Sequence, residues 1–376
     1  MRVVLTTYGS RGDVEPVVGL AVRLRELGAE VRVCAPPDEE FVVLMDRAGV
    51  PHVPLGPSVR EVMSAARPDP FRLAADLVAA RFDTLAAVAE GSDVVVAAGL
   101  MPAGARSIAE RLGIRYVFAS YQVYGLDKAT WDQNAERINS FYREPLNSRL
   151  AALGMPPVDN VRDHVFTDRP WLAADPALSP WQGVAALDVV PTGAWILPDS
   201  RPLSDELDDF LDAGEPPVYV GFGSMHLHAA PDLGRIAIDA VRARGRRVLL
   251  ARGWAELGAV DEADDCFVTG DVNQQALFRR VAAVIHHGGA GTTTTATRAG
   301  APQVVVPQIG DQPQFAARVA ELGVGAAHDG PTPTFDSLSA ALATALSPET
   351  ALRAKEVAGT IRSDGTTVAA KMLLEG

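Results

Sequence analysis

Four short loops of this chain combine glycine with side chains that can hold anions or move protons. The first loop, Tyr8–Asp13, places two glycines around Arg11 and ends in a carboxylate. Glycine lets the backbone turn sharply and approach a ligand closely. Asp13 is either a helix N-cap, for which Asp is favoured, or a functional carboxylate, because Pro16 lacks the N–H that a cap at Asp13 would use. Arg11 is either a solvated surface charge or a phosphate ligand.

The second loop, His286–Thr292, follows an apolar segment and leads into a helix that we expect from near Thr292 to Ala299. Free N–H groups at a helix N-terminus, preceded by glycines, form an anion site. Threonine is a poor helix former, so the hydroxyls of Thr292–Thr295 are expected to cap the helix and to donate to phosphate. The alternative is a turn that only closes a strand–helix unit. The spacing fits neither a P-loop nor Gly-x-Gly-x-x-Gly, because Thr294 stands at the third glycine.

The remaining two loops carry polar groups that suit a sugar or a nucleotide. Val306–Pro313 contains Asp311 and Gln312, which either cap the next helix or bind vicinal hydroxyls. Gly221–Ser224 is either a turn or a ligand cradle. The adjacent histidines His286 and His287 do not predict a metal site, because neighbouring side chains diverge at a strand end and no Cys, Asp or Glu lies at ligand spacing.

The loops are positioned by an alternation of short β-branched segments and helical ones. Strands are expected at 3–7, 31–35, 93–98, 116–119, 218–222, 247–251, 266–269, 281–286 and 303–307, and helices include 16–27 and 103–112. This βαβ rhythm predicts parallel sheets with helices on both faces. In doubly wound sheets ligands bind outside the carboxyl ends of the strands, and that is where the four loops fall.

The alternation breaks between about Arg143 and Gly214, where Pro, Trp and Asp are frequent, and this break predicts a domain junction. We expect an N-terminal Rossmann-like domain at 1–200 and a linker at 201–215. A C-terminal Rossmann-like domain is expected at 216–355, and a final helix at 356–376 that packs back on the first domain. The cleft between two such α/β domains is the natural ligand site.

Composition excludes several classes of protein. The chain has 34 Lys+Arg against 47 Asp+Glu, a net charge of -13, which argues against nucleic-acid binding. No segment approaches the ~20 apolar residues of a membrane span, and the N-terminus lacks the pattern of a secretory signal. Cys34 and Cys266 are the only cysteines, so no disulfide framework is expected. These features favour a cytoplasmic enzyme.

In this order the four loops resemble those of the GT-B glycosyltransferases, in particular the nucleotide-sugar-dependent inverting enzymes of antibiotic, sterol and plant natural products. The stretch 286–300, with Asp311 and Gln312 after it, is similar to the donor signature of that family. The segment 9–16 narrows the match to the antibiotic and sterol branch. Segments 167–175 and 192–199 resemble the glycopeptide-antibiotic glycosyltransferases, which act on vancomycin- and teicoplanin-type heptapeptides. The resemblance spans essentially the whole chain.

The resemblance implies a role for individual residues. Asp13 matches the general base that deprotonates the acceptor hydroxyl, and Ser10 lies beside it near the reacting sugar. Donor-binding positions are matched by Arg11, His287, Gly289, Gly291 and Thr292 for the diphosphate, Ser224 for phosphate or ribose, Val272 for a backbone pairing with the base, and Asp311 and Gln312 for sugar hydroxyls. There is one departure. Plant members stack a tryptophan on the base where this chain has Asp271.

The implied reaction is metal-independent transfer of a sugar from a UDP- or TDP-sugar to a hydroxyl of a peptide-derived aglycone. Inversion makes a β-glycoside from an α-linked donor, and no cofactor beyond this co-substrate is implied. Three alternatives stand: another natural-product or sterol acceptor, a GT-B nucleotide-sugar epimerase, and a non-catalytic nucleotide- or dinucleotide-binding protein. The failed glycine motif and the Asp13 loop speak against the last one.

The acceptor pocket is expected to be shaped by segments 57–70 and 121–142. Trp131, Phe141 and Tyr142 either stack on an aromatic aglycone or pack in the core at helical spacing.

Overall fold

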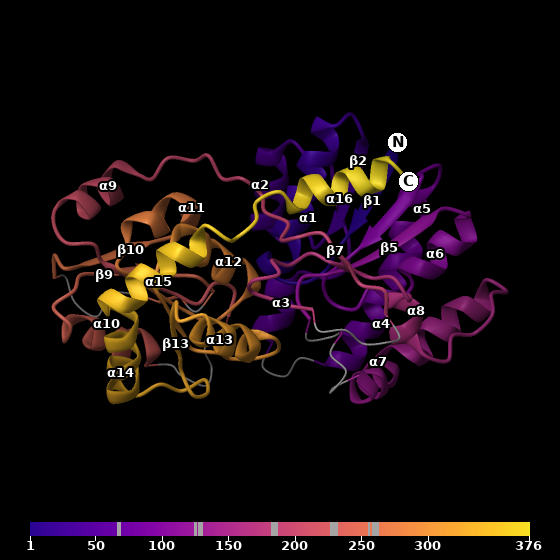
Figure 1. Cartoon of the computed structure of the whole chain (residues 1–376). Helices are drawn as coiled ribbons and strands as arrows, with labels where there is room; N and C mark the ends of the chain where they lie inside the picture. Colours follow the sequence, from indigo (N-terminus) through magenta and orange to yellow (C-terminus); the bar gives the residue numbers. More distant parts are fainter. Residues whose placement is uncertain are drawn as a thin grey trace. The chain divides into compact units, whose positions relative to one another are not determined.

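The computed structural model describes residues 1–65, 69–123, 126, 131–181, 187–225, 232–254, 256–257 and 263–376. The chain divides into two compact units (Figure 1). The first unit comprises Met1–Pro176, Pro180–Leu197 and Arg362–Gly376, and the second comprises Ala177–Ser179 and Pro198–Ile361. The C-terminal end of the chain therefore belongs to the unit in which the chain begins.

The sheet of the first unit is parallel throughout its described strands. The strands are β1 (Arg2–Thr6), β2 (Glu30–Ala35), β3 (His52–Pro54), β4 (Val94–Ala97), β5 (Arg115–Ser120), β6 (Trp171–Leu172) and β7 (Val190–Pro191). Their order is β3-β2-β1-β4-β5-β6-β7. The order reverses between β1 and β4, and such a switch point opens a crevice at the carboxyl ends of the strands.

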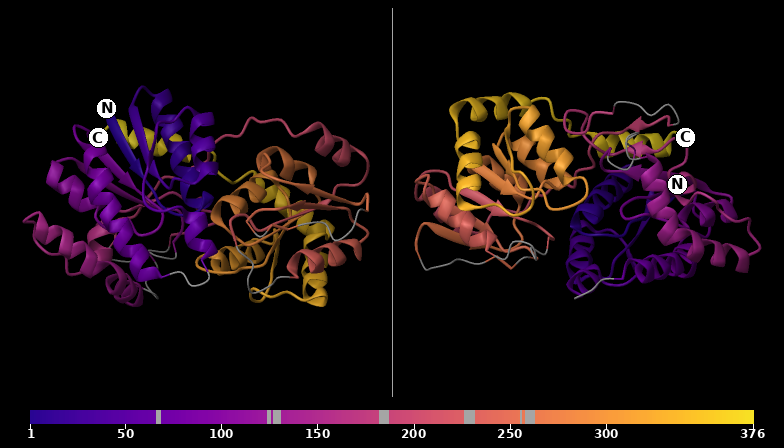
Figure 2. Two further views of the ribbon diagram at one scale, coloured as in Figure 1. Left: turned by 180° about the vertical axis from the view of Figure 1, so that it is seen from behind. Right: turned by 90° about the horizontal axis from the view of Figure 1, so that it is seen from below.

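Helices cover both faces of this sheet (Figure 2). They are α1 (Arg11–Glu26), α2 (Glu39–Ala48), α3 (Val59–Ser64), α4 (Pro70–Ala80), the π-helix η1 (Arg81–Leu85), α5 (Ala86–Ala89), α6 (Ala105–Leu112), α7 (Trp131–Ala152), α8 (Val161–Phe166) and α16 (Gly365–Leu374). Val3 and Leu5 join one core and Val4 another, because successive strand residues point to opposite faces. Within the described part of the chain, every helix is too short or too polar to cross a bilayer.

The second unit also contains a parallel sheet with a switch point. Its strands are β8 (Val218–Gly221), β9 (Val248–Ala251), β10 (Cys266–Thr269), β11 (Ala283–His286), β12 (Gln303–Val305) and β13 (Gly325–Ala327), in the order β10-β9-β8-β11-β12-β13. Its helices are α9 (Asp205–Asp212), α10 (Leu233–Arg242), α11 (Gln274–Leu277), the 3-10 turn η4 (Phe278–Arg280), α12 (Ala290–Ala299), α13 (Gln312–Glu321), α14 (Phe335–Ala345) and α15 (Pro348–Ala358). The switch point lies between β8 and β11.

Each strand expected from the sequence is present, with ends shifted by at most about two residues. The interval 143–214 is not merely a junction. It holds the C-terminal part of α7, all of α8 and α9, and the strands β6 and β7, which extend the first sheet. These two strands have two residues each, too few for a periodic pattern to show. The segment 201–215, expected as a linker, contains α9 and lies in the second unit.

The final helix α16 packs within the first unit, alongside α1 (Figure 1). Ala369, Ala370 and Leu373 are buried in the same core as Val3 and Leu5. Nη1 of Arg115 donates to the carbonyl of Leu373 at 3.2 Å. The chain re-enters the first unit at Arg362. The N–H of Arg362 donates to Oδ2 of the buried Asp175 at 2.8 Å and so fixes this position.

Candidate functional site

The Asp13 loop follows β1, at the switch point of the first sheet. Ser10 is the N-cap of α1, so Asp13 is not the N-cap itself, but its side chain still helps to cap the helix as the N3 residue of a capping box with Ser10. Asp13 lies in the first turn, and its Oδ2 accepts the N–H of Ser10 at 2.9 Å. The backbone carbonyl of Asp13 accepts the hydroxyls of Thr7 at 3.0 Å and Tyr121 at 3.1 Å. The segments after β1 and β5 therefore hold the backbone of Asp13 in place, and its carboxylate is half-buried.

Gly9 makes this geometry possible. Its φ of +145° lies outside the range that side chains tolerate well. A Cβ at this position would lie 2.1 Å from Oδ2 of Asp13. Any side chain at position 9 would displace the carboxylate.

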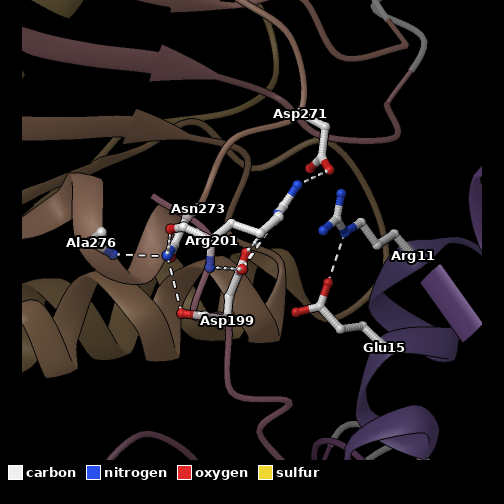
Figure 3. Close-up of polar contacts among 7 residues, drawn as sticks. All are labelled: Arg11, Glu15, Asp199, Arg201, Asp271, Asn273 and Ala276. Atoms are coloured by element: carbon white, nitrogen blue, oxygen red, sulfur yellow. Dashed lines mark hydrogen bonds and ion pairs between the residues drawn. The ribbon is translucent and has the colours of Figure 1, made fainter. Parts of the chain in front are cut away.

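Arg11 pairs with Glu15 one helical turn later. Its Nε lies 2.7 Å from the Glu15 carboxylate, and both side chains are about one-third exposed (Figure 3). Pairs of this kind are worth ~0–1 kcal/mol, so the guanidinium can take a phosphate as a partner at small cost.

The two adjacent histidines, at the end of β11, lie in different environments. His286 is fully buried, and its Nδ1 accepts the N–H of Gly288 at 3.1 Å. The proton must then sit on Nε2, which donates to Oε1 of Gln303 at 3.0 Å. Burial lowers the pKa of His286 to about 3. The Gln303 amide donates in turn to Oγ1 of Thr297 at 3.0 Å. The hydrogen bonds among His286, Gln303 and Thr297 thus hold the turn at Gly288 in place.

His287 faces the glycine loops instead. Its ring plane makes an angle of 86° with that of His286, with centroids 6.4 Å apart. A Cβ added to Gly289 would lie 2.5 Å from its Nε2, and one added to Gly223 would lie 3.3 Å from its Cε1. Burial lowers the pKa of His287 to about 4. Among the described residues its buried Nδ1 has no hydrogen-bond partner, so a polar ligand group would satisfy it.

Helix α12 begins at Ala290, two residues before the expected start, with Gly289 as its N-cap. The hydroxyls of Thr293 and Thr294 donate to the carbonyls of Gly289 at 2.9 Å and Ala290 at 2.7 Å. The expectation that these hydroxyls donate to phosphate is therefore wrong, because back-bonding within the helix uses their hydrogens.

Gly291 and Thr292 remain available in the first turn of α12. Gly291 is exposed and Thr292 half-buried. The free N–H groups and the helix dipole make this end favourable for an anion.

After β12, Asp311 occupies the N-cap position of α13, and Gln312 is the first residue of that helix. The Asp311 side chain makes no cap hydrogen bond, and burial raises its pKa. Oε1 of Gln312 accepts the N–H groups of Gln308 at 2.7 Å and Ile309 at 3.0 Å. The side-chain carbonyl of Gln312 thus supports its own loop, and Nε2 donates to Sδ of Met225 at 3.6 Å. The second hydrogen of this buried NH₂ group is the part that suits a sugar hydroxyl.

Ser224 and Val272 follow β8 and β10. Ser224 is half-buried in a turn closed by the N–H of Met225, which donates to the carbonyl of Phe222 at 3.1 Å. Val272 is half-buried and precedes Asn273, the N-cap of α11. His287, Gly289, Asp311 and Gln312 follow β11 and β12, so the expected donor residues of this unit lie at the carboxyl edge of one sheet.

The expected acceptor segments include residues 66–68, 124–125 and 127–130, which lie outside the described residues. Tyr142 is buried in the core. Phe141 makes an edge contact with the exposed Phe71, with ring centroids 4.8 Å apart. The Arg162 guanidinium lies 3.5 Å from the ring centroid of Trp131. These contacts favour packing over stacking on an aglycone for Tyr142 and Trp131.

Sequence reasoning missed Thr7, Tyr121, Thr297 and Gln303, which hold the loops in place. Only Gln303 gave a usable signal, as a polar residue in an apolar strand. The described residues contain no group of three or more His, Cys, Asp or Glu that could hold a metal ion.

Family models match both halves of the chain. Residues 3–128 match the glycosyltransferase family 28 N-terminal domain. Residues 262–368 match the erythromycin biosynthesis protein CIII-like C-terminal domain.

Three relatives from Amycolatopsis orientalis align along nearly their whole length. The glycosyltransferase GtfE is 56% identical, over 99% of this chain and 97% of the relative. A vancomycin aglycone glucosyltransferase is 55% identical, over 100% of this chain and 97% of the relative. A dTDP-epi-vancosaminyltransferase is 52% identical, over 95% of this chain and 93% of the relative.

Solved structures agree in fold. The glycosyltransferase of kitacinnamycin superposes with a TM-score of 0.80 at 21% identity, covering 100% of this chain and 98% of that one. The glycosyltransferase VinC in complex with dTDP gives a TM-score of 0.71 at 24% identity, covering 100% and 99%.

Proposed function

The chain belongs to the glycosyltransferases of the glycopeptide-antibiotic branch and has the GT-B fold of two Rossmann-like domains, and from this premise we propose its reaction. It transfers a sugar from a UDP- or TDP-sugar to a hydroxyl of a glycopeptide aglycone, with inversion at the anomeric carbon. The observation that carries the acceptor class is the 55% identity with a vancomycin aglycone glucosyltransferase along the whole chain.

Asp13 is the general base of this mechanism. Its carboxylate takes the proton of the acceptor hydroxyl while the acceptor oxygen bonds to C1 of the sugar. The bond from C1 to the phosphate oxygen breaks, and the nucleoside diphosphate leaves with the electron pair. Ser10 supports the reaction through its N–H, which holds Oδ2 of Asp13 at 2.9 Å. One displacement makes a β-glycoside from an α-linked donor.

The second unit binds the donor. The growing charge on the leaving diphosphate meets the N-terminus of α12, with Gly289, Gly291 and Thr292. His287 is neutral near pH 7, because burial lowers its pKa to about 4, so it acts on phosphate as a hydrogen-bond donor. Arg11 of the first unit adds a positive charge. These groups suffice for metal-independent transfer, and we expect activity to persist in EDTA.

The rest of the donor binds to the loops that follow the other strands. Ser224 bonds phosphate or ribose, and the backbone of Val272 pairs with the base. Asp311 and the amide NH₂ of Gln312 bind sugar hydroxyls. Two hydrogen-bonding side chains at adjacent positions are suited to neighbouring hydroxyls. We place the reaction in the cytoplasm, since Cys34 and Cys266 form no disulfide with each other.

The test is to incubate the protein with a glycopeptide aglycone and a panel of UDP- and TDP-sugars, and to follow the products by mass spectrometry. We expect a mass increase of one sugar, and an NMR coupling constant for a β-anomer. Free sugar and nucleotide without a glycoside would overturn the acceptor assignment. Conversion of donor without acceptor would favour the epimerase, and tight binding of a nicotinamide cofactor would favour the dinucleotide-binding alternative.

A further inference from the structure

The turn Gly270–Asn273 lies at the open edge of the second sheet. It follows β10, which is the outermost strand and pairs with β9. Gly270 and Asp271 are exposed and Val272 is half-buried. An edge turn has no neighbouring strand on its outer side, so its shape depends on the side chains that hold it there.

Asn273 provides the first of these anchors. Its side chain is only 4% exposed. Oδ1 accepts the N–H of Ala276 at 3.0 Å and so caps α11. Nδ2 donates to the backbone carbonyls of Asp199 at 3.0 Å and Arg201 at 2.7 Å. One buried amide therefore joins the turn to the segment 199–201 (Figure 3).

Arg201 provides the second anchor. Its Nε and Nη2 donate to the Asp199 carboxylate at 2.9 Å and 2.6 Å, and its Nη1 donates to Oδ2 of Asp271 at 2.7 Å (Figure 3). The hydrogen bonds with Asp199, and then with Asp271, raise the pKa of Arg201. The planar fork of an arginine can hold two carboxylates in fixed directions, which a lysine cannot do.

We propose that Arg201 and Asn273 are positioning residues for the nucleotide of the donor. They hold the Gly270–Asn273 turn against the segment 199–201, and so keep the peptide groups of Val272 where the base pairs with them. The inference rests on the proposed function, which assigns Val272 to the base. Hydrogen-bonded recognition needs positions fixed to within about 0.5 Å. The segment begins one residue after Pro198, where the chain enters the second unit.

A matched control comes from the same unit. Arg242 forms a fork with Asp265 at 2.9 Å and 2.6 Å. The exposed fractions of that pair are 24% and 40%, against 26% and 48% for Arg201 and Asp271. Arg242 lies on α10, remote in sequence from the turn. Arg242→Met therefore removes a comparable ion pair without touching the turn.

The experiment is calorimetric titration of UDP and TDP into the whole protein, together with donor and acceptor KM values and melting temperatures. Arg201→Met is expected to raise the nucleotide Kd and the donor KM about tenfold, as a loss of fixed position does, and to leave the acceptor KM unchanged. Arg201→Lys recovers only part of the affinity. Arg242→Met changes the nucleotide Kd less than about twofold.

Asn273→Asp separates capping from anchoring. An aspartate still accepts the N–H of Ala276 but has no hydrogen for the two carbonyls, so it should raise the nucleotide Kd as Asn273→Ala does. Its buried charge would face two carbonyl oxygens, so it should lower the melting temperature at least as much. Equal nucleotide affinities in Arg201→Met, Arg242→Met and the wild type would overturn the inference. Failure of the wild type to bind UDP or TDP would instead overturn the donor assignment.

Discussion

At the residue scale, Asp13 is placed by contacts on both its side chain and its backbone. Ser10 holds one carboxylate oxygen, while Thr7 and Tyr121 hold the carbonyl. Gly9 leaves the space that this arrangement needs. Such over-determination is typical of groups that must meet a substrate in one orientation. The motif Gly9–Pro16 predicted the residue, but only the structure showed which groups hold it.

The buried His286 and the half-buried His287 predict a pH-dependent stability. Their pKa values are about 3 and about 4 in the folded protein, against ~6.5 in an unfolded chain. Below pH 6.5 the unfolded chain binds protons that the folded protein does not, so the free energy of unfolding falls as pH drops from 6.5 toward 4. The slope is at most ~1.4 kcal/mol per pH unit for each histidine, and above 6.5 neither contributes.

Urea denaturation at pH 7.5 and pH 5 measures this effect in the wild type and in His287→Gln. The variant lacks one of the two titrations, so its free energy of unfolding should fall by about 2 kcal/mol less between the two pH values. The same fall in both proteins would mean that His287 titrates normally in the folded state.

At the element scale, α12 and the turn before it depend on a polar network inside an apolar sheet. His286, Gln303 and Thr297 are each at most 1% exposed. They link the end of β11 to β12 and to the last turn of α12. The glycines and threonines of the loop predicted an anion site, but the partners are separated by up to 17 residues in sequence, and spacing alone does not reveal such contacts.

Gln303→Leu tests the network. Leucine fills the space but leaves Nε2–H of His286 without this partner, at a cost of ~1–3 kcal/mol. The Thr297 hydroxyl keeps its hydrogen bond to the carbonyl of Thr293. We expect a lower melting temperature and a nucleotide Kd raised severalfold in calorimetry, because Gly288 loses its fixed support. Thr295→Val, at a half-buried position on the same helix, is the control. A variant as unstable as expected but with unchanged Kd would show that the network serves folding alone.

At the scale of the whole molecule, the chain builds two similar parallel sheets. The alternation of β-branched and helical segments predicted both sheets and most of their strands. It missed β3, β6, β7 and β13, which have two or three residues each. The crossing of the chain at Leu197 falls inside the Pro- and Trp-rich interval. That interval also holds helices, because burial of residues such as Leu146 and Val161 outweighs local composition.

The last helix, α16, is an integral part of the first unit's core. Leu373 is 1% exposed, so Leu373→Ala is expected to lower the free energy of unfolding by ~2–5 kcal/mol. Leu352→Ala, at a position 64% exposed, should change it by less than about 0.5 kcal/mol. Guanidinium denaturation followed by tryptophan fluorescence measures both. Equal effects of the two substitutions would show that α16 is dispensable for the core.

The central claim is that the first unit supplies the base and the second holds the donor, and Asp13→Asn tests it most directly. Asparagine keeps an oxygen to accept the N–H of Ser10 but cannot take a proton. Turnover with a glycopeptide aglycone and a nucleotide sugar should fall by ~10²–10⁴-fold, while the calorimetric Kd for UDP or TDP stays within about twofold of the wild type. Unchanged turnover in Asp13→Asn would contradict the account.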